Sequence, residues 1–357
     1  MKVAFRTDAS SVIGTGHFMR CFTLAVELKR CKAQIIFICR NLPDYLSKML
    51  TLNGIELELL FSPQNEMQVD ELAHASWLGV SQVEDAADSI EMLSKGEWDW
   101  LVIDHYALDY RWESLIRQRV KKIIVIDDIA DRQHDCDVLL DQNFYTNMEE
   151  RYKDLVPVHC QLLLGPRYAL LRSEFREERN HVKPRKGSVK RILVFFGGID
   201  NENFTGKAID ALLEIDLVGL YVDVVIGSQH PYKEKIETSC LKHGFCLHVQ
   251  TNKMAELMAN SDLAIGAGGS ASWERCCVGL PAVLIAIADN QIDIAMGLDS
   301  YGACVFVGTS KTINISILRN AIVNIMNGQD QLNTLSKKSL LLVDGMGIDR
   351  VYKVLDC

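Results

Sequence analysis

A histidine beside a pair of glycines is the first residue whose type and position suggest chemistry. It is His17, in the segment RTDASSVIGTGHFMRC of residues 6–21. Gly14 and Gly16 permit a tight turn at which a ligand can approach the backbone. An imidazole has an ordinary pKa of about 6.5 and can accept a proton at neutral pH, and the Asp8 carboxylate upstream can orient it. An isolated histidine at such a turn is more often incidental, but this placement predicts a general base.

A second glycine turn, in residues 266–291 (GAGGSASWERCCVGLPAVLIAIADNQ), suggests a site for phosphate. Gly268 and Gly269 follow a predicted strand, and Ser270 is expected to cap the helix that comes next. The free N–H groups at the start of a helix attract anions, so a diphosphate fits there. Glu274, one turn into the helix, can accept hydrogen bonds from ribose hydroxyls, although taken alone it is more simply a solvated carboxylate.

Two further clusters place polar side chains after predicted strands. One consists of Asp104, His105 and Tyr106, and the other of Asp127, Asp128, Asp131, His134, Asp135 and Asp137. Loose Asp and His spacing of the second kind is more often turn and cap chemistry than a metal site. The cysteines lack zinc spacing, and Gly206–Lys207 fails the phosphate-loop pattern G-x-x-x-x-G-K-[ST]. We predict no metal and no cofactor.

Short apolar runs predict the elements that position these motifs. We expect buried strands at residues 1–5, 33–39, 100–104, 122–128, 191–196, 221–226, 261–265 and 282–286. Helical spacing of apolar residues follows each glycine turn. A strand, a glycine loop, a helix and a further strand make a unit of a parallel sheet. Because ligands bind at the carboxyl ends of parallel strands, the motifs stand where such sheets place their ligands.

The pattern occurs twice, and a charged stretch separates the two occurrences. Residues 176–191 (REERNHVKPRKGSVKR) contain a proline and a glycine and lack apolar periodicity, which is typical of a linker. We predict an α/β protein with two doubly wound, Rossmann-like domains facing a ligand cleft. The expected domains are residues 1–178, with the catalytic glycine loop, and 191–357, joined by a linker at 179–190. This division leaves room for the last helix to pack against the N-terminal domain.

Composition and charge exclude several classes of protein. The chain has 357 residues, 48% of them hydrophobic and 24% charged, which excludes a disordered or fibrous chain and suggests about two domains. A net charge of −9 argues against nucleic acid as a partner. Eleven cysteines, an odd number without disulfide spacing, indicate reduced thiols. With no apolar run near the roughly 20 residues of a membrane span and no secretion signal, we predict a cytoplasmic protein without membrane insertion.

The motifs together resemble the PseG family, UDP-sugar hydrolases of pseudaminic acid biosynthesis that are related in fold to MurG-type glycosyltransferases. The resemblance starts at RTDASSVIGTGHFMRC and covers most of the chain. It continues in the family order through IDHYALDYRWE, DDIADRQHDCDVLLDQN, LLGPRYALLRSEF, FFGGIDNEN, GGSASWERC and IADNQ. It implies a GT-B-like fold and UDP-2,4-diacetamido-2,4,6-trideoxy-β-L-altropyranose as the substrate, from which UDP is removed with inversion at the anomeric carbon.

The resemblance also implies roles for particular residues. Three of them are implied to be catalytic: His17, as the base that activates water, Tyr106 and Asn290. The diphosphate falls at Gly269 and Ser270. The expected substrate- and UDP-binding residues are Asp8, Gly14, Gly16, Arg172, Gly198, Gly268, Gly269, Ser270, Glu274 and Gln291. UDP is accordingly expected on the C-terminal domain.

Other classes of function stay open at this stage. A GT-B glycosyltransferase would use an acceptor hydroxyl in place of water, and the negative net charge argues mildly against the membrane docking that such enzymes often need. A non-catalytic nucleotide-sugar binding protein would bind UDP without turnover. A nicotinamide-dependent oxidoreductase is disfavoured because Met19 stands where the pattern G-x-G-x-x-G requires its third glycine.

Overall fold

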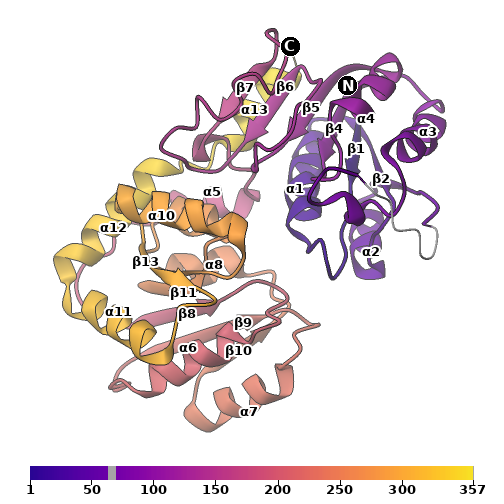
Figure 1. Ribbon diagram of the computed structural model, residues 1–357. Helices are drawn as coiled ribbons and strands as arrows, with labels where there is room; N and C mark the ends of the chain where they lie inside the picture. Colours follow the sequence, from indigo (N-terminus) through magenta and orange to yellow (C-terminus); the bar gives the residue numbers. More distant parts are fainter. Residues whose placement is uncertain (63–69, 357) are drawn as a thin grey trace. The chain divides into compact units, whose positions relative to one another are not determined.

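The computed structural model describes residues 1–62 and 70–356, and the chain divides into two compact units (Figure 1). Unit 1 comprises Met1–Asn143, Asn147–Leu170 and Gly347–Cys357, and unit 2 comprises Phe144–Thr146 and Leu171–Met346. The division falls before the stretch that we expected to be a linker, which is part of unit 2. Among the described residues, no helix combines the length and hydropathy that crossing a membrane requires.

Unit 1 is built on a parallel sheet with the strand order β3-β2-β1-β4-β5-β6-β7. Its described strands are β1 (Lys2–Thr7), β2 (Gln34–Cys39), β3 (Glu56–Leu59), β4 (Trp98–Asp104), β5 (Val120–Ile126), β6 (Val138–Asp141) and β7 (Gln161–Leu164). Its helices are α1 (Gly16–Arg30), α2 (Asp44–Leu52), α3 (Gln82–Leu93), α4 (Tyr110–Ile116) and α13 (Gly347–Leu355), with 3₁₀ turns η1 (Ala75–Trp77), η2 (Arg117–Arg119) and η3 (Pro166–Tyr168).

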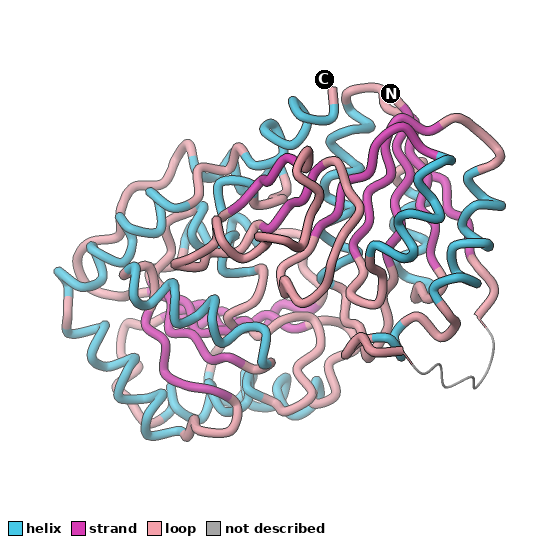
Figure 2. Tube along the Cα trace, turned by 45° about the horizontal axis from the view of Figure 1, so that its top comes forward, coloured by secondary structure: helices cyan, strands magenta, loops and turns pink. Residues whose placement is uncertain are grey.

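Both faces of this sheet are covered by helices, as Figure 2 shows with helices in cyan and strands in magenta. Val3 and Phe5 of β1 pack in one core with residues of α1, α2 and α13. Ala4, which points to the opposite face, packs in a second core with residues of α3 and α4. Strands buried on both faces need continuous apolar sequence, which is the pattern that predicted them.

Unit 2 repeats this architecture with the parallel strand order β10-β9-β8-β11-β12-β13. Its described strands are β8 (Arg191–Phe195), β9 (Tyr221–Ile226), β10 (Cys246–Val249), β11 (Leu263–Ala267), β12 (Ala282–Ala286) and β13 (Val305–Thr309). Its helices are α5 (Ser173–Arg179), α6 (Phe204–Leu213), α7 (Lys233–His243), α8 (Met254–Asn260), α9 (Ala271–Cys277), α10 (Ile292–Tyr301), α11 (Ile315–Asn327) and α12 (Gln329–Leu342), with the 3₁₀ turn η4 (Asp289–Gln291). The predicted pair of doubly wound α/β domains is confirmed.

The charged stretch that suggested a linker is packed into unit 2 by its arginines. Arg185 is only 8% exposed, and its guanidinium donates to the carbonyl oxygens of Met258 at 3.1 Å and Ala259 at 2.7 Å, in α8, and to that of Val278 after α9. Arg179 donates to carbonyl oxygens of α9 and α12. Cations satisfy the unpaired carbonyls at helix ends and interact favourably with the helix dipole. These two arginines therefore cap helix ends and tie the predicted linker to unit 2.

Candidate active site

The predicted base lies at the carboxyl edge of the unit 1 sheet. The loop after β1 contains Gly14, whose φ of +79° is a conformation that glycine adopts without strain. α1 begins at Gly16, so His17 is its second residue, and it is 9% exposed. Strand β4 pairs with β1 and ends at Asp104. The strand order therefore brings the end of β4 beside the start of α1.

Asp104 holds the imidazole of His17. Its carboxylate accepts Nδ1 of His17 at 2.6 Å and Nε and Nη2 of Arg20 at 2.5 and 2.7 Å. Burial by itself would raise the pKa of Asp104, but Arg20 and His17 outweigh burial and hold that pKa well below its usual range. A carboxylate on Nδ1 keeps the proton there, so Nε2 carries the lone pair that a general base needs.

Asp8, which we expected to orient His17 and to bind substrate, is fully buried among other partners. Its carboxylate pairs with Arg6 at 2.9 Å and with His105 at 3.2 Å, and it accepts the backbone N–H groups at the end of β2. Burial would raise its pKa, but Arg6 and His105 lower it. Asp8 thus links β1 to the residues that follow β2 and β4, and the carboxylate that orients His17 is that of Asp104.

Tyr106 stands edge-on to His17, with 4.5 Å between the ring centroids. Its hydroxyl donates to Asp128, and the same carboxylate accepts Nη1 of Arg20 at 2.8 Å. Burial, together with the charge of Asp128, raises the pKa of Tyr106 well above its ordinary value. The hydroxyl therefore stays protonated at neutral pH, and Tyr106 acts as a hydrogen-bonding and packing group. Arg20 joins Asp104 and Asp128 in one network.

Two rings from residues 70–80 complete this set, and sequence reasoning did not single them out. Trp77 is stacked on Tyr106 with 5.5 Å between centroids and lies 6.0 Å from His17. His74 packs against Trp77 at 4.5 Å. Aromatic walls around a few convergent polar groups are typical of small-molecule sites. No spacing marks this segment, so only the fold reveals it.

The aspartates after β5 and β6 hold turns and arginines in place. Asp127 accepts the N–H of Ala130 at 2.9 Å and pairs with Arg132 at 2.8 Å, which is the turn chemistry that the sequence predicted. Asp141, at the end of β6, differs from the others. Burial, followed by the neighbouring charges of Asp128 and Asp127, raises the pKa of Asp141 to about 8. This carboxyl group is therefore largely protonated at neutral pH.

In unit 2, the second glycine turn joins β11 to α9 at the carboxyl edge of the sheet. β11 lies between β8 and β12, so the loops after these three strands share one edge. A Cβ on Gly266 would lie 2.3 Å from the carbonyl oxygen of Phe195 in β8, so only glycine allows the strands to approach there. Gly198 belongs to the loop after β8, and Asn290 and Gln291 to the turn η4 after β12.

The start of α9 presents backbone N–H groups rather than a side-chain cap. Within the described ranges, no backbone hydrogen bond is donated by the N–H groups of Gly269, Ser270 and Ala271. Ser270 occupies the N-cap position, but its backbone is already helical and its hydroxyl makes no capping hydrogen bond. The predicted capping role is therefore wrong. Unpaired N–H groups at a helix start suit an anion.

Glu274 and Gln291 lie close to this turn. Glu274 Oε1 is 3.5 Å from Nη2 of Arg172, and the Glu274 side chain is 22% exposed. Burial raises the pKa of Glu274, and Arg172 opposes that shift. A Cβ on Gly269 would lie 3.5 Å from Nε2 of Gln291, so this amide borders the N–H groups. Asn290 is exposed.

The predicted site residues thus form two sets, one in each unit. In unit 1 the set consists of Asp8, Gly14, Gly16, His17 and Tyr106, and in unit 2 of Arg172, Gly198, Gly268, Gly269, Ser270, Glu274, Asn290 and Gln291. Sequence reasoning missed the roles of Arg20 and Asp128 and the pairing of Asp104 with His17. A signal for Arg20 was available, because it follows His17 by three residues and so lies on the same helix face.

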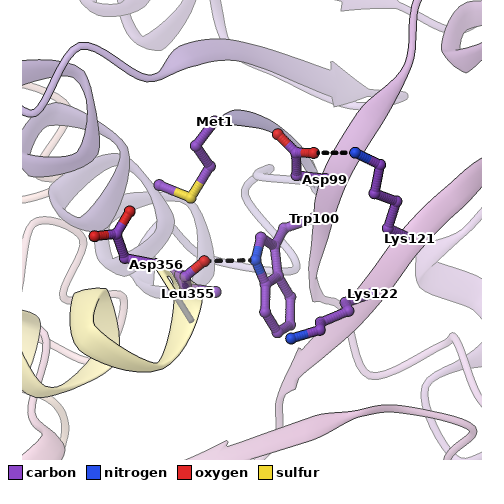
Figure 3. A pocket seen from close by; sticks show the side chains of 7 residues that line it. All are labelled: Met1, Asp99, Trp100, Lys121, Lys122, Leu355 and Asp356. Atoms are coloured by element: carbon purple, nitrogen blue, oxygen red, sulfur yellow. Dashed lines mark hydrogen bonds and ion pairs between the residues drawn. The ribbon is translucent and has the colours of Figure 1, made fainter.

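A pocket of about 250 Å³ lies at the other edge of the unit 1 sheet. It is lined by Met1, Asp99, Trp100, Lys121, Lys122, Leu355 and Asp356 (Figure 3). Nζ of Lys121 pairs with Asp99 at 2.7 Å, and Nε1 of Trp100 donates to the carbonyl oxygen of Leu355 at 2.8 Å. The Asp99 carboxylate and the Trp100 N–H are thus both engaged in contacts within the pocket.

Comparison with a family model and with solved structures identifies the fold. Residues 192–349 match the glycosyltransferase family 28 C-terminal domain. The whole chain superposes on MurG of Acinetobacter baumannii with a TM-score of 0.67, 13% identity and 99% coverage of both chains. It superposes on the spinosyn rhamnosyltransferase SpnG, complexed with thymidine diphosphate, with a TM-score of 0.66, 14% identity and 99% coverage of both. The chain therefore has the GT-B-like fold of two parallel-sheet α/β domains that the sequence predicted.

Comparison with curated proteins narrows this class. The chain is 26% identical to the UDP-2,4-diacetamido-2,4,6-trideoxy-beta-L-altropyranose hydrolase of Campylobacter jejuni, over 85% of this chain and 97% of that protein. It is 30% identical to the spore coat polysaccharide biosynthesis protein SpsG of Bacillus subtilis, over 57% of this chain and 61% of that protein. It is 25% identical to an uncharacterised protein of Methanocaldococcus jannaschii over 80% of this chain, but spans only 55% of that relative. The resemblance to the PseG family is confirmed.

Proposed function

We propose that this protein is an enzyme acting on nucleotide sugars, and specifically a hydrolase that releases UDP from a UDP-linked 2,4-diacetamido-2,4,6-trideoxy hexose in pseudaminic acid biosynthesis. The family 28 domain and the similarity to the Campylobacter hydrolase support the enzyme class. The observation that carries the hydrolytic chemistry is the buried pairing of Asp104 with His17, which leaves Nε2 of His17 as the base.

Unit 2 is proposed to hold the UDP moiety. The N–H groups of Gly269, Ser270 and Ala271 donate to the diphosphate, and Glu274 accepts from the ribose hydroxyls. Negative charge grows on the diphosphate as the glycosyl bond breaks, and fixed N–H donors stabilise that charge without reorganising. A diphosphate leaves without needing a proton from an acid. The proposed mechanism therefore needs a general base but no general acid, whereas ordinary glycosidases use two carboxylates.

Unit 1 is proposed to supply the base. Nε2 of His17 takes a proton from water as the water oxygen bonds to the anomeric carbon, on the face opposite UDP. The bond between that carbon and the diphosphate oxygen breaks in the same step, through an oxocarbenium-like transition state. The released sugar therefore has the inverted configuration at the anomeric carbon. Tyr106 and Asn290 orient the sugar or the water.

Glycosyl transfer is a second candidate, favoured by the whole-chain resemblance to a rhamnosyltransferase and by the family 28 domain. His17 would then deprotonate an acceptor hydroxyl instead of water. The two candidates differ in one measurable respect, because a hydrolase releases UDP rapidly in the absence of any acceptor.

The test is to incubate the protein with the UDP-sugar in ¹⁸O-labelled water and to follow UDP release, the anomeric signals and the position of the label. A hydrolase places ¹⁸O on the sugar, with inversion. His17→Asn should lower kcat by about 10²–10⁴-fold, the usual worth of a general base, whereas His181→Asn, at an exposed histidine of unit 2, should not change it. Label in the UDP, or full turnover by a folded His17→Asn variant, would refute this mechanism.

A further inference from the structure

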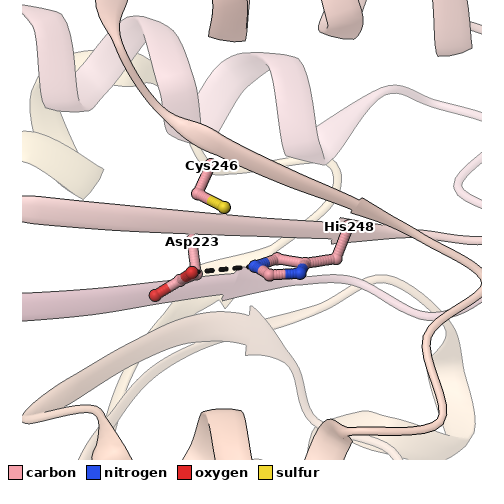
Figure 4. Close-up of side chains that lie close together, drawn as sticks. All are labelled: Asp223, Cys246 and His248. Atoms are coloured by element: carbon pink, nitrogen blue, oxygen red, sulfur yellow. Dashed lines mark hydrogen bonds and ion pairs between the residues drawn. The ribbon is translucent and has the colours of Figure 1, made fainter.

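We propose that unit 2 carries a zinc-type metal site formed by Asp223, Cys246 and His248. One ligand atom from each, a carboxylate oxygen, a thiol sulfur and an imidazole nitrogen, lies within 4.8 Å of the other two. Figure 4 shows the three side chains pointing toward one another from two neighbouring strands. Neither the catalytic set of unit 1 nor the glycine turn of unit 2 uses any of them.

The register of the sheet builds this group. In the parallel pair β9–β10, Cys246 is the Cα partner of Asp223. His248 follows Cys246 by two residues, and alternate residues of a strand share a face. All three side chains therefore stand on one face of the sheet, at its edge strand β10. The sequence contains Cys246-x-His248, but the third member is distant in sequence and only strand pairing supplies it.

The ligand set suits zinc. Thiolate, imidazole and carboxylate are the three side-chain groups that bind Zn²⁺, and three protein ligands with a water complete a tetrahedral site. Nε2 of His248 now lies 2.8 Å from Oδ1 of Asp223. With metal bonds of about 2.0–2.2 Å and tetrahedral angles, the two atoms would stand about 3.3 Å apart. A movement of about half an ångström between these two atoms thus makes room for the ion, and the Cys246 sulfur lies within 4.8 Å of both.

Arg191 fits this site as the partner of the other carboxylate oxygen. Its Nε donates to Oδ2 of Asp223 at 2.6 Å, and its Nη2 makes a longer contact of 3.3 Å with Oδ1, so Oδ1 is the oxygen more readily offered to a metal. Hydrogen-bonded carboxylates of this kind are common behind metal ligands and orient them. The Asp223 side chain is 1% exposed, the His248 side chain is 25% exposed and Cys246 is exposed. An ion therefore has a path from solvent.

The position of the group indicates a structural role. Cys246 is the first residue of β10, and the group stands away from the carboxyl edge that carries Gly198 and Gly269. The edge strand β10 is short and has a single neighbour in the sheet. A metal bound by both β9 and β10 would hold this edge strand in the sheet. Because the ion binds only the folded chain, it raises the free energy of unfolding.

The test is a titration of the full chain, stripped by chelator, with Co²⁺ and then Zn²⁺. We expect one Co²⁺ per chain with the intense visible bands of tetrahedral cobalt and a thiolate charge-transfer band. We expect Zn²⁺ to displace the Co²⁺ and to raise the unfolding temperature. Cys246→Ser and His248→Asn should each weaken binding by more than about 100-fold, since even a lost outer-shell partner costs about 10–100-fold.

Cys31→Ser is the matched control, because Cys31 is the other exposed cysteine among the described residues. It should leave the spectrum and the affinity unchanged. Asp223→Asn keeps shape and a hydrogen-bond acceptor for Arg191, so it should fold and bind Co²⁺ more weakly. Cobalt binding without a thiolate band, or with equal affinity in Cys246→Ser, would overturn the proposal. UDP release by the variants is expected to match the wild type.

Discussion

Asp104 makes the histidine at the start of α1 usable as a base. Its carboxylate is shared between Nδ1 of His17 and the Arg20 guanidinium, and Arg20 also reaches Asp128, which holds Tyr106. A substitution of any of these side chains should therefore alter the position or the protonation of the His17 imidazole. This network gives the first prediction.

Asp104→Asn should lower kcat by about 10²–10⁴-fold with little change in KM, because an amide can present its N–H₂ to Nδ1 and shift the ring proton to Nε2. Steady-state kinetics with the UDP-sugar measures this. Asp99→Asn, in the same strand and paired with Lys121 at 2.7 Å, is the control and should keep full activity. Equal activity in the two variants would mean that Asp104 does not position His17.

Asp141 gives a pH dependence with a defined sign. Its pKa is raised to about 8, so the folded chain binds this proton more tightly than the unfolded chain does. The stabilisation is complete below the unfolded pKa of about 3.9 and is lost as the pH rises through about 8. In urea unfolding from about pH 5 to about pH 9, wild-type stability should fall more steeply than that of Asp141→Asn. Asp154→Asn, at an exposed position, should follow the wild type.

The residue types of the site were predictable, but their partners were not. His17 and Tyr106 were placed at strand ends from local pattern alone. The partner of His17 depends on β4 pairing with β1, two strands separated by about a hundred residues, and sequence proximity pointed to Asp8 instead. Arg6 and His105 bury that carboxylate, an outcome that only the packed sheet determines.

At the scale of elements, the glycine turns and the strands with long apolar runs were predicted, whereas five further strands were not: β3, β6, β7, β10 and β13. Strands buried on both faces leave an apolar signature that stands out, and β9 and β12 have the predicted bounds. Residues 176–191 lack apolar periodicity. This is typical of a linker, but it is equally compatible with a segment that is held in place by hydrogen bonds. Arg185 is the clearest instance, since its charge faces helix-end carbonyls that no local pattern reveals.

Arg185→Met should therefore destabilise the protein by about 2–4 kcal/mol, because it leaves several buried carbonyl groups without a donor. Burial lowers the pKa of Arg185 to about 10, so the side chain is still charged at neutral pH. Chemical denaturation measures the loss. The neighbouring Lys186→Met, at an exposed position, should change stability by less than about 0.5 kcal/mol. A similar effect of both changes would show that the contacts of Arg185 do not stabilise unit 2.

At the scale of the whole molecule, the chain leaves unit 1, builds unit 2 and returns for one helix. Val351 and Leu355 of α13 lie in a core cluster of unit 1 with Val3 and Phe5, and the carbonyl oxygen of Leu355 accepts Nε1 of Trp100. Strand β1 and helix α13 thus share one core, although unit 2 separates them in the sequence.

Leu355→Ala should cost about 2–5 kcal/mol, as large-to-small changes in a packed core do, because Leu355 is 3% exposed. Leu341→Ala, in α12 and 77% exposed, should cost almost nothing. Calorimetry of the two variants separates them. Equal unfolding temperatures would show that α13 does not contribute to the unit 1 core.

The return of α13 has a consequence for the order of events on the ribosome. Domains generally fold as they are made, the N-terminal one first, at roughly 5–20 residues per second. Here the first unit lacks its last helix until all of unit 2 has been synthesised, a delay on the order of ten seconds or more. During that interval the face of the sheet that α13 will cover stays open, so unit 1, although most of it is synthesised first, is completed after unit 2.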